Sequence, residues 1–159
     1  MEKTALLNSL PQVGKIEWIG LRPSSKEEMQ VVSSVEVSLE EGLVGDRYAS
    51  KSKKRQVTLI QKEHLEAVSS LLDKAVTPSS CRRNILISGI NLLAFKDRQF
   101  KIGEVILEMT GLCHPCSKME RNLGPGGYNA MRGHGGITAR VIKAGIIELG
   151  QSVILRKEE

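Results

Sequence analysis

Short apolar segments rich in branched side chains recur along this 159-residue chain, and they constrain its fold more than any other feature of the sequence. QVTLI (56–60) and NILI (84–87) are typical of buried strands, because they are short, mostly apolar and rich in branched side chains. Other segments alternate apolar with polar side chains or form short apolar groups, which also indicates strands. These segments lie at 29–39, 105–109, 146–149 and 153–155.

One further segment has the spacing of a helix. In QKEHLEAVSSLLDK (61–74), Leu65, Val68 and Leu72 recur at helical intervals, and Pro78 ends the pattern. About six or more short strands, this single good helix and many glycine turns predict a mostly β domain. We expect a closed or nearly closed β-barrel with a few short helices, rather than a sheet built from βαβ units.

The length of the chain suits one packed domain. We expect residues 1–12 to form an N-terminal tail and residues 13–156 to form the barrel. Hydrophobic residues make up 40% of the chain and charged residues 26%, as in an ordinary globular protein. No apolar run approaches the roughly 20 residues of a membrane-spanning helix, and the first residues lack the apolar core of a signal peptide. A cytoplasmic protein without a membrane partner is therefore expected.

The formal net charge of +5 suits an anionic partner, such as a phosphorylated cofactor or a nucleic acid. Aromatic residues make up only 3% of the chain, which leaves few stacking platforms for single-stranded nucleic acid. A solvated basic surface explains a charge of this size better, so nucleic-acid binding is not the expected function.

Four local features are expected to be structural. The stretch 24–27 (SSKE) and the basic run 51–55 (KSKKR) read as loops. The turn 45–47 (GDR) is expected to hold a local pair between its aspartate and its arginine. His64 lies on the predicted helix beside Leu65, which favours a place at the surface or at the edge of the core.

Two of the three cysteines form a C-x-x-C motif directly after the 105–109 strand. Cys113 and Cys116 enclose His114 and Pro115. Thiolates at this spacing bind a soft metal, form a redox disulfide, or act as a nucleophile and its resolving partner. A plain structural loop has the same spacing, so the motif alone does not choose among these roles.

Two of these alternatives make further demands on the sequence. A structural zinc site needs four ligands, which Cys81 and either His114 or His134 would have to complete. A thioredoxin-type dithiol lies between the strand and the helix of a βαβ unit, which the pattern of this chain does not predict. The sequence therefore favours neither a zinc site nor a thioredoxin-type dithiol.

Glycine clusters at 124–127 (GPGG) and 133–136 (GHGG) follow the motif. Their backbone N–H groups can approach an anion or another segment, although tight turns explain such clusters equally well. Arg132 and Arg140 flank the second cluster, and guanidinium groups bind phosphate through two parallel hydrogen bonds.

Arg82, Arg83 and Asn84 lie at the start of the NILI strand. Two arginines at the entrance of a buried strand reduce stability unless they are solvated or paired. One hypothesis is that they bind an anion. The alternative is that one arginine faces water and the other faces a carboxylate.

Taken in order, these segments resemble the MOSC domain, a module found at the C-terminus of molybdenum cofactor sulfurases and in small stand-alone bacterial proteins. The resemblance runs from about residue 13 to residue 155 and rests on the order of the motifs. The matching segments are 42–60, 81–92, 100–120 and 131–155. The resemblance implies a mostly β barrel that binds the molybdenum cofactor, molybdopterin with its metal.

The resemblance also implies a role for each cysteine of the motif. Members of the family keep a cysteine after a proline, so Cys116, which follows Pro115, would be the molybdenum ligand or the residue that carries sulfur. A thiolate is a soft ligand that suits such a metal. Cys113 would be a neighbouring thiol that tunes the reactivity of Cys116 or acts as its resolving partner. Tyr48 stands where relatives often have histidine, so we expect no proton donor at that position.

The remaining site residues also come from the resemblance. Arg82 and Asn84 match an R-x-N segment of the family and would contact the pterin and its phosphate. The glycine-rich loop with Arg132, His134 and Gly135 would close the other side of the cofactor.

These residues imply an oxidoreductase that reduces small N-hydroxylated compounds and takes electrons from a separate reductase. The alternative is a sulfur carrier in which Cys116 holds a persulfide supplied by a cysteine desulfurase. A non-catalytic zinc or nucleic-acid-binding module is a lower alternative. Pyridoxal phosphate is not expected, because in cofactor sulfurases it belongs to a separate domain.

Overall fold

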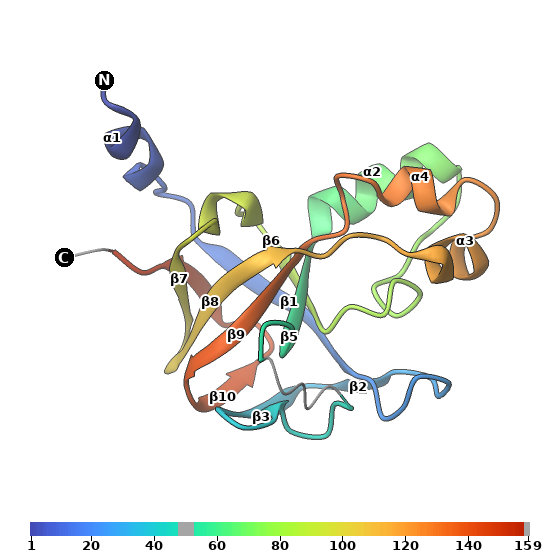
Figure 1. Cartoon of the computed structure of the whole chain (residues 1–159), viewed down its shortest axis with the longest axis horizontal. Helices are drawn as coiled ribbons and strands as arrows, with labels where there is room; N and C mark the ends of the chain where they lie inside the picture. The colour runs from blue at the N-terminus through green and yellow to red at the C-terminus, as the bar shows by residue number, and fades with distance from the viewer. Residues whose placement is uncertain (48–52, 158–159) are drawn as a thin grey trace.

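The computed structural model describes residues 1–47 and 53–157, and strands make up most of its regular structure (Figure 1). The strands are β1 (Gly14–Leu21), β2 (Gln30–Val32), β3 (Ser34–Ser38), β4 (Gly42–Leu43), β5 (Val57–Gln61), β6 (Ile85–Ser88), β7 (Gln99–Ile102), β8 (Val105–Leu112), β9 (Ile137–Lys143), β10 (Gly145–Glu148) and β11 (Ser152–Leu155). The helices are α1 (Lys3–Asn8), α2 (Lys62–Leu72), α3 (Ser117–Leu123), α4 (Gly127–Met131) and the single 3₁₀ turn η1 (Leu92–Phe95). The predicted mostly β fold with a few short helices is confirmed.

Within the described residues, seven strands close into a barrel. They follow the order β11-β7-β8-β9-β5-β6-β1, and β1 pairs with β11 to complete the ring. β2 extends the sheet beyond β1, while β10, β3 and β4 form a smaller sheet. Closure removes the exposed edges that an open sheet of this size would present.

β5, α2 and β6 form a parallel crossover, because β5 and β6 run in the same direction. The sequence pattern predicted no βαβ unit, and that expectation is wrong for this part of the chain. The helix between the strands was predicted correctly, and Leu65 and Val68 on it are buried. The C-x-x-C motif lies elsewhere, between β8 and α3.

Two apolar clusters fill the molecule. The larger one lies inside the barrel and consists mainly of aliphatic side chains, together with Phe95 and Phe100, whose rings stack with centroids 4.4 Å apart. The second joins α2, α3 and α4 to the outside of β5 and β6, and it includes Cys81, Met119 and Met131. Burial of each large apolar side chain contributes about 1.5–3 kcal/mol to folding. The second cluster therefore stabilises the packing of the helices against the barrel.

The segment 29–39 was expected to be one half-buried strand, and it forms two. β2 pairs with β1, whereas β3 pairs with β10 and β4, so the chain changes sheets at Ser33. Val35 and Val37 are buried as the alternation predicts, but Val31 is exposed.

The N-terminal residues form the short helix α1, whose side chains are exposed. The stretch 24–27 is a loop, as expected, and Ser24 Oγ accepts the backbone N–H groups of Lys26 and Glu27. Of the basic run 51–55, only residues 53–55 lie within the described residues, and Tyr48 lies outside them. Among the helices of the described residues, none combines the length and the apolar character that crossing a membrane requires.

Candidate functional site

Three segments that the sequence singled out meet where β8 ends and where β6 and β9 begin. Arg83 joins them: its guanidinium donates hydrogen bonds to the carbonyl oxygens of Gly135 and Cys81, both at 2.8 Å, and of Cys113 at 3.4 Å. The backbone N–H of Cys113 donates to the carbonyl of Gly136 at 2.8 Å. The arginine pair, the C-x-x-C loop and the second glycine cluster therefore form one packed unit.

The environment of Arg83 differs from both expectations for the arginine pair. Arg83 is only 6% exposed, and three backbone carbonyl oxygens, not a carboxylate of the chain, accept the hydrogen bonds described above. Hydrogen bonds from a charged donor are stronger than those between neutral groups, so three such bonds account for the buried guanidinium. Arg83 therefore acts as a structural clamp.

Arg82 is only partly buried, and its partners differ from those of Arg83. Its guanidinium donates to the carbonyl oxygens of Ser24 at 2.7 Å and Glu27 at 2.5 Å, and its backbone has a left-handed φ of 58°. Such a φ is uncommon for a residue with a side chain and is often found at functional sites. Burial, and then the positive charges of Arg22 and Arg47, lower the pKa of Arg82 from its ordinary value. The carboxylate of Asp46 acts in the opposite direction, so the positive charge around Arg82 is partly offset.

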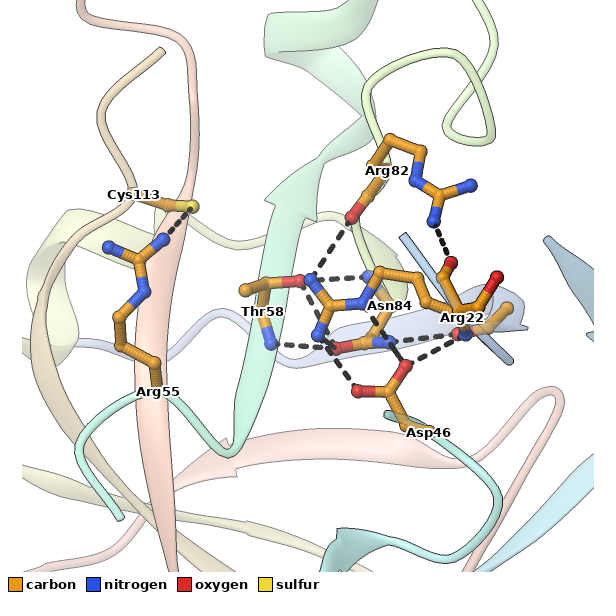
Figure 2. A network of polar contacts seen from close by, with 9 residues as sticks. Arg22, Asp46, Arg55, Thr58, Arg82, Asn84 and Cys113 are labelled. Atoms are coloured by element: carbon orange, nitrogen blue, oxygen red, sulfur yellow. Dashed lines mark hydrogen bonds and ion pairs between the residues drawn. The ribbon is translucent and has the colours of Figure 1, made fainter. Parts of the chain in front are cut away.

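Asn84 is the centre of a buried polar network (Figure 2). Its Oδ1 accepts hydrogen bonds from the backbone N–H and the hydroxyl of Thr58, at 3.1 and 3.2 Å, and from Arg22 at 3.2 Å. Its Nδ2 donates to the carbonyl of Gly20 at 3.0 Å and to Asp46 at 3.2 Å. Asn84 therefore fixes β1, β5 and the 45–47 turn relative to one another.

Asp46 pairs with Arg22 across 24 residues of sequence, at 2.8 Å between carboxylate and guanidinium. The backbone N–H of Arg22 also donates to Asp46 at 2.8 Å. Burial of the carboxylate opposes ionisation, but the hydrogen bonds and charge of Arg22, with a hydrogen bond from Asn84, outweigh it and lower the pKa of Asp46. The sequence predicted a local pair within the 45–47 turn, and it did not indicate that Arg22 is the principal partner of Asp46.

The two cysteines of the motif have different surroundings. Cys113 is 3% exposed, and the guanidinium of Arg55 lies 3.9 Å from its Sγ (Figure 2). Cys116 is exposed at the residue that precedes α3. Asn122 of α3 donates to the carbonyl of Ser80 at 3.0 Å, which ties this helix to the segment before Arg82. Cys116 is thus the thiol that a large ligand can reach directly.

The glycine clusters have internal partners. The N–H groups of Gly126 and Tyr128 donate to the carboxylate of Glu120, at 3.1 and 3.0 Å. These two bonds, the one from Tyr128 first, lower the pKa of Glu120. The first cluster therefore binds an anion that belongs to the chain itself.

In the second cluster, a side chain on Gly135 or Gly136 would meet backbone. A Cβ on Gly135 would lie 2.1 Å from the carbonyl oxygen of Cys113, and one on Gly136 would lie 2.0 Å from that of Leu59. His134 Nδ1 donates to the carbonyl of Ala130 at 3.0 Å. Close packing explains these glycines, and their predicted contacts with a cofactor stay predictions.

Gly136→Ala is expected to lower the free energy of unfolding by about 3 kcal/mol or more, because its new methyl group would push β5 away from β9 and its φ is +86°. Gly133→Ala is the matched control: φ there is +80°, but open space surrounds the new methyl group. Backbone strain alone should cost the control about 1 kcal/mol. Urea unfolding of both variants gives the comparison, and equal losses would contradict the packing argument.

The two arginines that flank the second cluster have different partners. Arg140 on β9 forms an ion pair with Glu108 of β8 at 2.7 Å, which explains it as a cross-strand pair. Arg132 is exposed, and its guanidinium lies 3.5 Å from the side-chain oxygen of Asn129. Both side chains are exposed, and within the described residues Arg140 is the one of the two that is held in an ion pair.

A pocket of about 310 Å³ lies beside the C-x-x-C loop. Cys113, His114 and Pro115 form part of its wall, with His64 of α2 and Leu93 of η1. Its volume is at the small end of the range of about 300–1,000 Å³ for ligand sites.

A zinc site is not supported by the described residues, among which no group of three or more His, Cys, Asp or Glu side chains is placed to hold a metal ion. Cys81 is fully buried, burial raises the pKa of its thiol, and its Sγ lies 3.9 Å from the sulfur of Met131. Cys81 thus belongs to the apolar packing of the helices.

Known proteins share sequence features and the fold with this chain. The sequence profile of the MOSC domain matches residues 46–154. No curated protein matches the chain in sequence. Similar solved structures include the YuaD protein from Bacillus subtilis, with a TM-score of 0.79 and 14% identity over 94% of this chain and 100% of that one. YiiM from Geobacillus stearothermophilus has a TM-score of 0.72 and 18% identity, over 91% of this chain and 75% of that one. YiiM from Escherichia coli has a TM-score of 0.70 and 17% identity, over 91% and 71%.

Proposed function

Because the chain belongs to the MOSC domain family, we propose that it binds the molybdenum cofactor and reduces N-hydroxylated compounds with electrons from a separate reductase. The observation that carries this proposal is the exposed thiol of Cys116, on a loop that packs against an arginine-rich segment. An exposed thiol is open to a metal, and the partly buried Arg82 of the neighbouring segment could meet a phosphate.

The residues fit the cofactor in their chemistry. Cys116 would hold the metal, since a thiolate is a soft ligand. Arg82 would meet the phosphate, because Arg22 and Arg47 add positive charge around it. Arg132, His134 and Gly135 would border the opposite side.

Asn84 has a more indirect place in this proposal. Its amide is fully buried and bonded to Thr58, Asp46 and Arg22. It would act by holding these groups, and through them the arginine-rich region, in position. The buried network is then the support of the cofactor site rather than part of its surface.

The proposed reaction breaks the N–O bond of a substrate R–NHOH. Two electrons and two protons convert it to the amine R–NH₂ and water, and the electron donor is a flavin- or iron–sulfur-containing reductase that is oxidised in turn. When bound, the cofactor supplies the redox-active centre for this reduction. The chain supplies the thiol, the positive charge and the shape of the site.

The exposure of Cys116 also favours a second function, transfer of sulfur. Thiol exchange requires an accessible sulfur, and Cys116 is accessible while Cys113 is buried. In this function Cys116 would carry a persulfide obtained from a cysteine desulfurase.

Molybdenum and pterin content separates the two functions. Wild-type chain from cells that make the cofactor is expected to carry both in stoichiometric amounts and, once reduced, to convert N-hydroxylated compounds to amines. Metal analysis, pterin fluorescence after oxidation and product chromatography measure this. A chain that lacks molybdenum but acquires a persulfide from a cysteine desulfurase would replace the reductase proposal with the sulfur-carrier one.

A further inference from the structure

The pocket beside the C-x-x-C loop differs from the rest of the chain in charge. Among the described residues that line it, none is Asp, Glu, Lys or Arg, although these types make up 26% of the chain. Leucine, isoleucine, proline and glycine form most of the wall. Charged side chains lie in adjoining cavities: one shares Leu93 and Leu112 and contains Lys96 and Asp97, and another shares Gln61 and contains Glu63.

The few polar side chains of the pocket are held in place. Gln61 Oε1 accepts the backbone N–H of Leu92 at 3.1 Å, which fixes its amide. The ring of His64 meets that of His134 edge to face, with centroids 5.4 Å apart. Burial, and then the neighbouring His134, lower the pKa of His64 against the opposing charge of Glu63, and this favours its neutral imidazole.

One wall of the pocket is close to a positive charge. Arg55, whose guanidinium lies 3.9 Å from Cys113 Sγ, is not among the lining residues. Its charge acts across the thiol and disfavours a cation in the pocket. A neutral, apolar ligand enters such a site without the loss of hydration that a charged one would suffer.

Resting on the proposed function, we infer that this pocket holds the uncharged, apolar body of an N-hydroxylated substrate and rejects the protonated amine produced from it. Residues 113–115 line the pocket, and Cys116 is the next residue of the chain. In this proposal the N–OH group of a seated substrate is directed toward Cys116. An N-hydroxylated amine is a much weaker base than the amine itself, so it is neutral at neutral pH. Reduction therefore turns a ligand that suits the pocket into a cation that does not, which favours product release.

Binding is tested first with two unreactive probes of equal size, benzyl alcohol and benzylamine. At about pH 7.5 benzylamine is a cation, as aliphatic amines are, and benzyl alcohol is neutral. With the isotope-labelled full chain, benzyl alcohol is expected to shift the amide NMR signals of pocket residues such as Leu93 and Gly135, and benzylamine is not. Equal shifts with both probes, or none with benzyl alcohol, would overturn the inference.

Leu93→Glu places a carboxylate in the pocket wall and is expected to reverse this preference, so that benzylamine binds. Leu93 is 45% exposed, so the change is compatible with folding. Leu71→Glu is the matched control, because Leu71 is 65% exposed on α2 and does not line the pocket. A preference that stays the same in Leu93→Glu, or that reverses equally in Leu71→Glu, would count against the pocket.

Turnover separates the failure of this inference from the failure of the proposed function. In the cofactor-loaded chain, Leu93→Glu is expected to raise KM for N-benzylhydroxylamine by about tenfold, in line with the loss of one apolar contact, and to leave KM for hydroxylamine unchanged. Equal changes for both substrates would overturn the pocket assignment while the reductase stands. If neither substrate is reduced by the wild type, the proposed function fails, and the binding preference alone decides whether the pocket is selective.

Discussion

Cys116→Ser is expected to lose most of its bound molybdenum, and its rate of N-hydroxy reduction should fall by about a hundredfold or more, because even residues behind a metal ligand affect metal affinity or activity by about 10–100-fold. Serine keeps the size of the side chain but replaces the soft sulfur with a harder oxygen. Because Cys116 is exposed, the substitution should leave the fold intact. Metal content per folded chain and steady-state rates are the measurements.

Cys113→Ser is the matched control for this experiment. Cys113 is buried in the packed unit around Arg83, and its sulfur faces Arg55. This variant should retain molybdenum, with a smaller change in rate. If Cys113→Ser loses the metal and Cys116→Ser keeps it, the ligand assignment is wrong and the buried thiol takes that role.

The strands that the sequence predicted are those with a simple side-chain pattern. β5 and β6 are mostly apolar, and all of their residues but Ser88 are buried, because both faces of these strands are covered. β1 was not predicted, since its register shifts between Ile16 and Trp18 and its burial does not alternate. A bulge of this kind interrupts the period of two on which strand prediction depends.

Within the candidate site, the sequence indicated the segments but not their contacts. No sequence pattern indicated a role for Arg22, yet it forms the ion pair with Asp46 and donates a hydrogen bond to Asn84. Arg55 lay in a charged run that read as a solvated loop, yet it reaches Cys113. These contacts span 24 to 62 residues of sequence, and only the closed barrel brings such distant positions together.

Asp46→Asn is expected to lower the free energy of unfolding at neutral pH by about 3–5 kcal/mol, the usual loss when one partner of a buried ion pair is removed. The side chains of Arg22 and Asp46 are only 9% and 1% exposed, so water replaces the lost interaction poorly. Glu104→Gln is the control, since its pair with Lys143 is largely exposed and should contribute less than about 1 kcal/mol.

The dependence on pH tests whether charge causes the loss in Asp46→Asn. The pKa of Asp46 is lowered in the folded chain, so its contribution is complete above the ordinary aspartate pKa of about 3.9 and is lost as pH falls through the lower folded value. The difference in unfolding free energy between wild type and Asp46→Asn should therefore be constant from about pH 7 to about pH 5 and shrink below about pH 4. Urea titrations across this range give the curve. A difference that persists undiminished in acid would assign the loss to packing and hydrogen bonding rather than to the charge of the carboxylate.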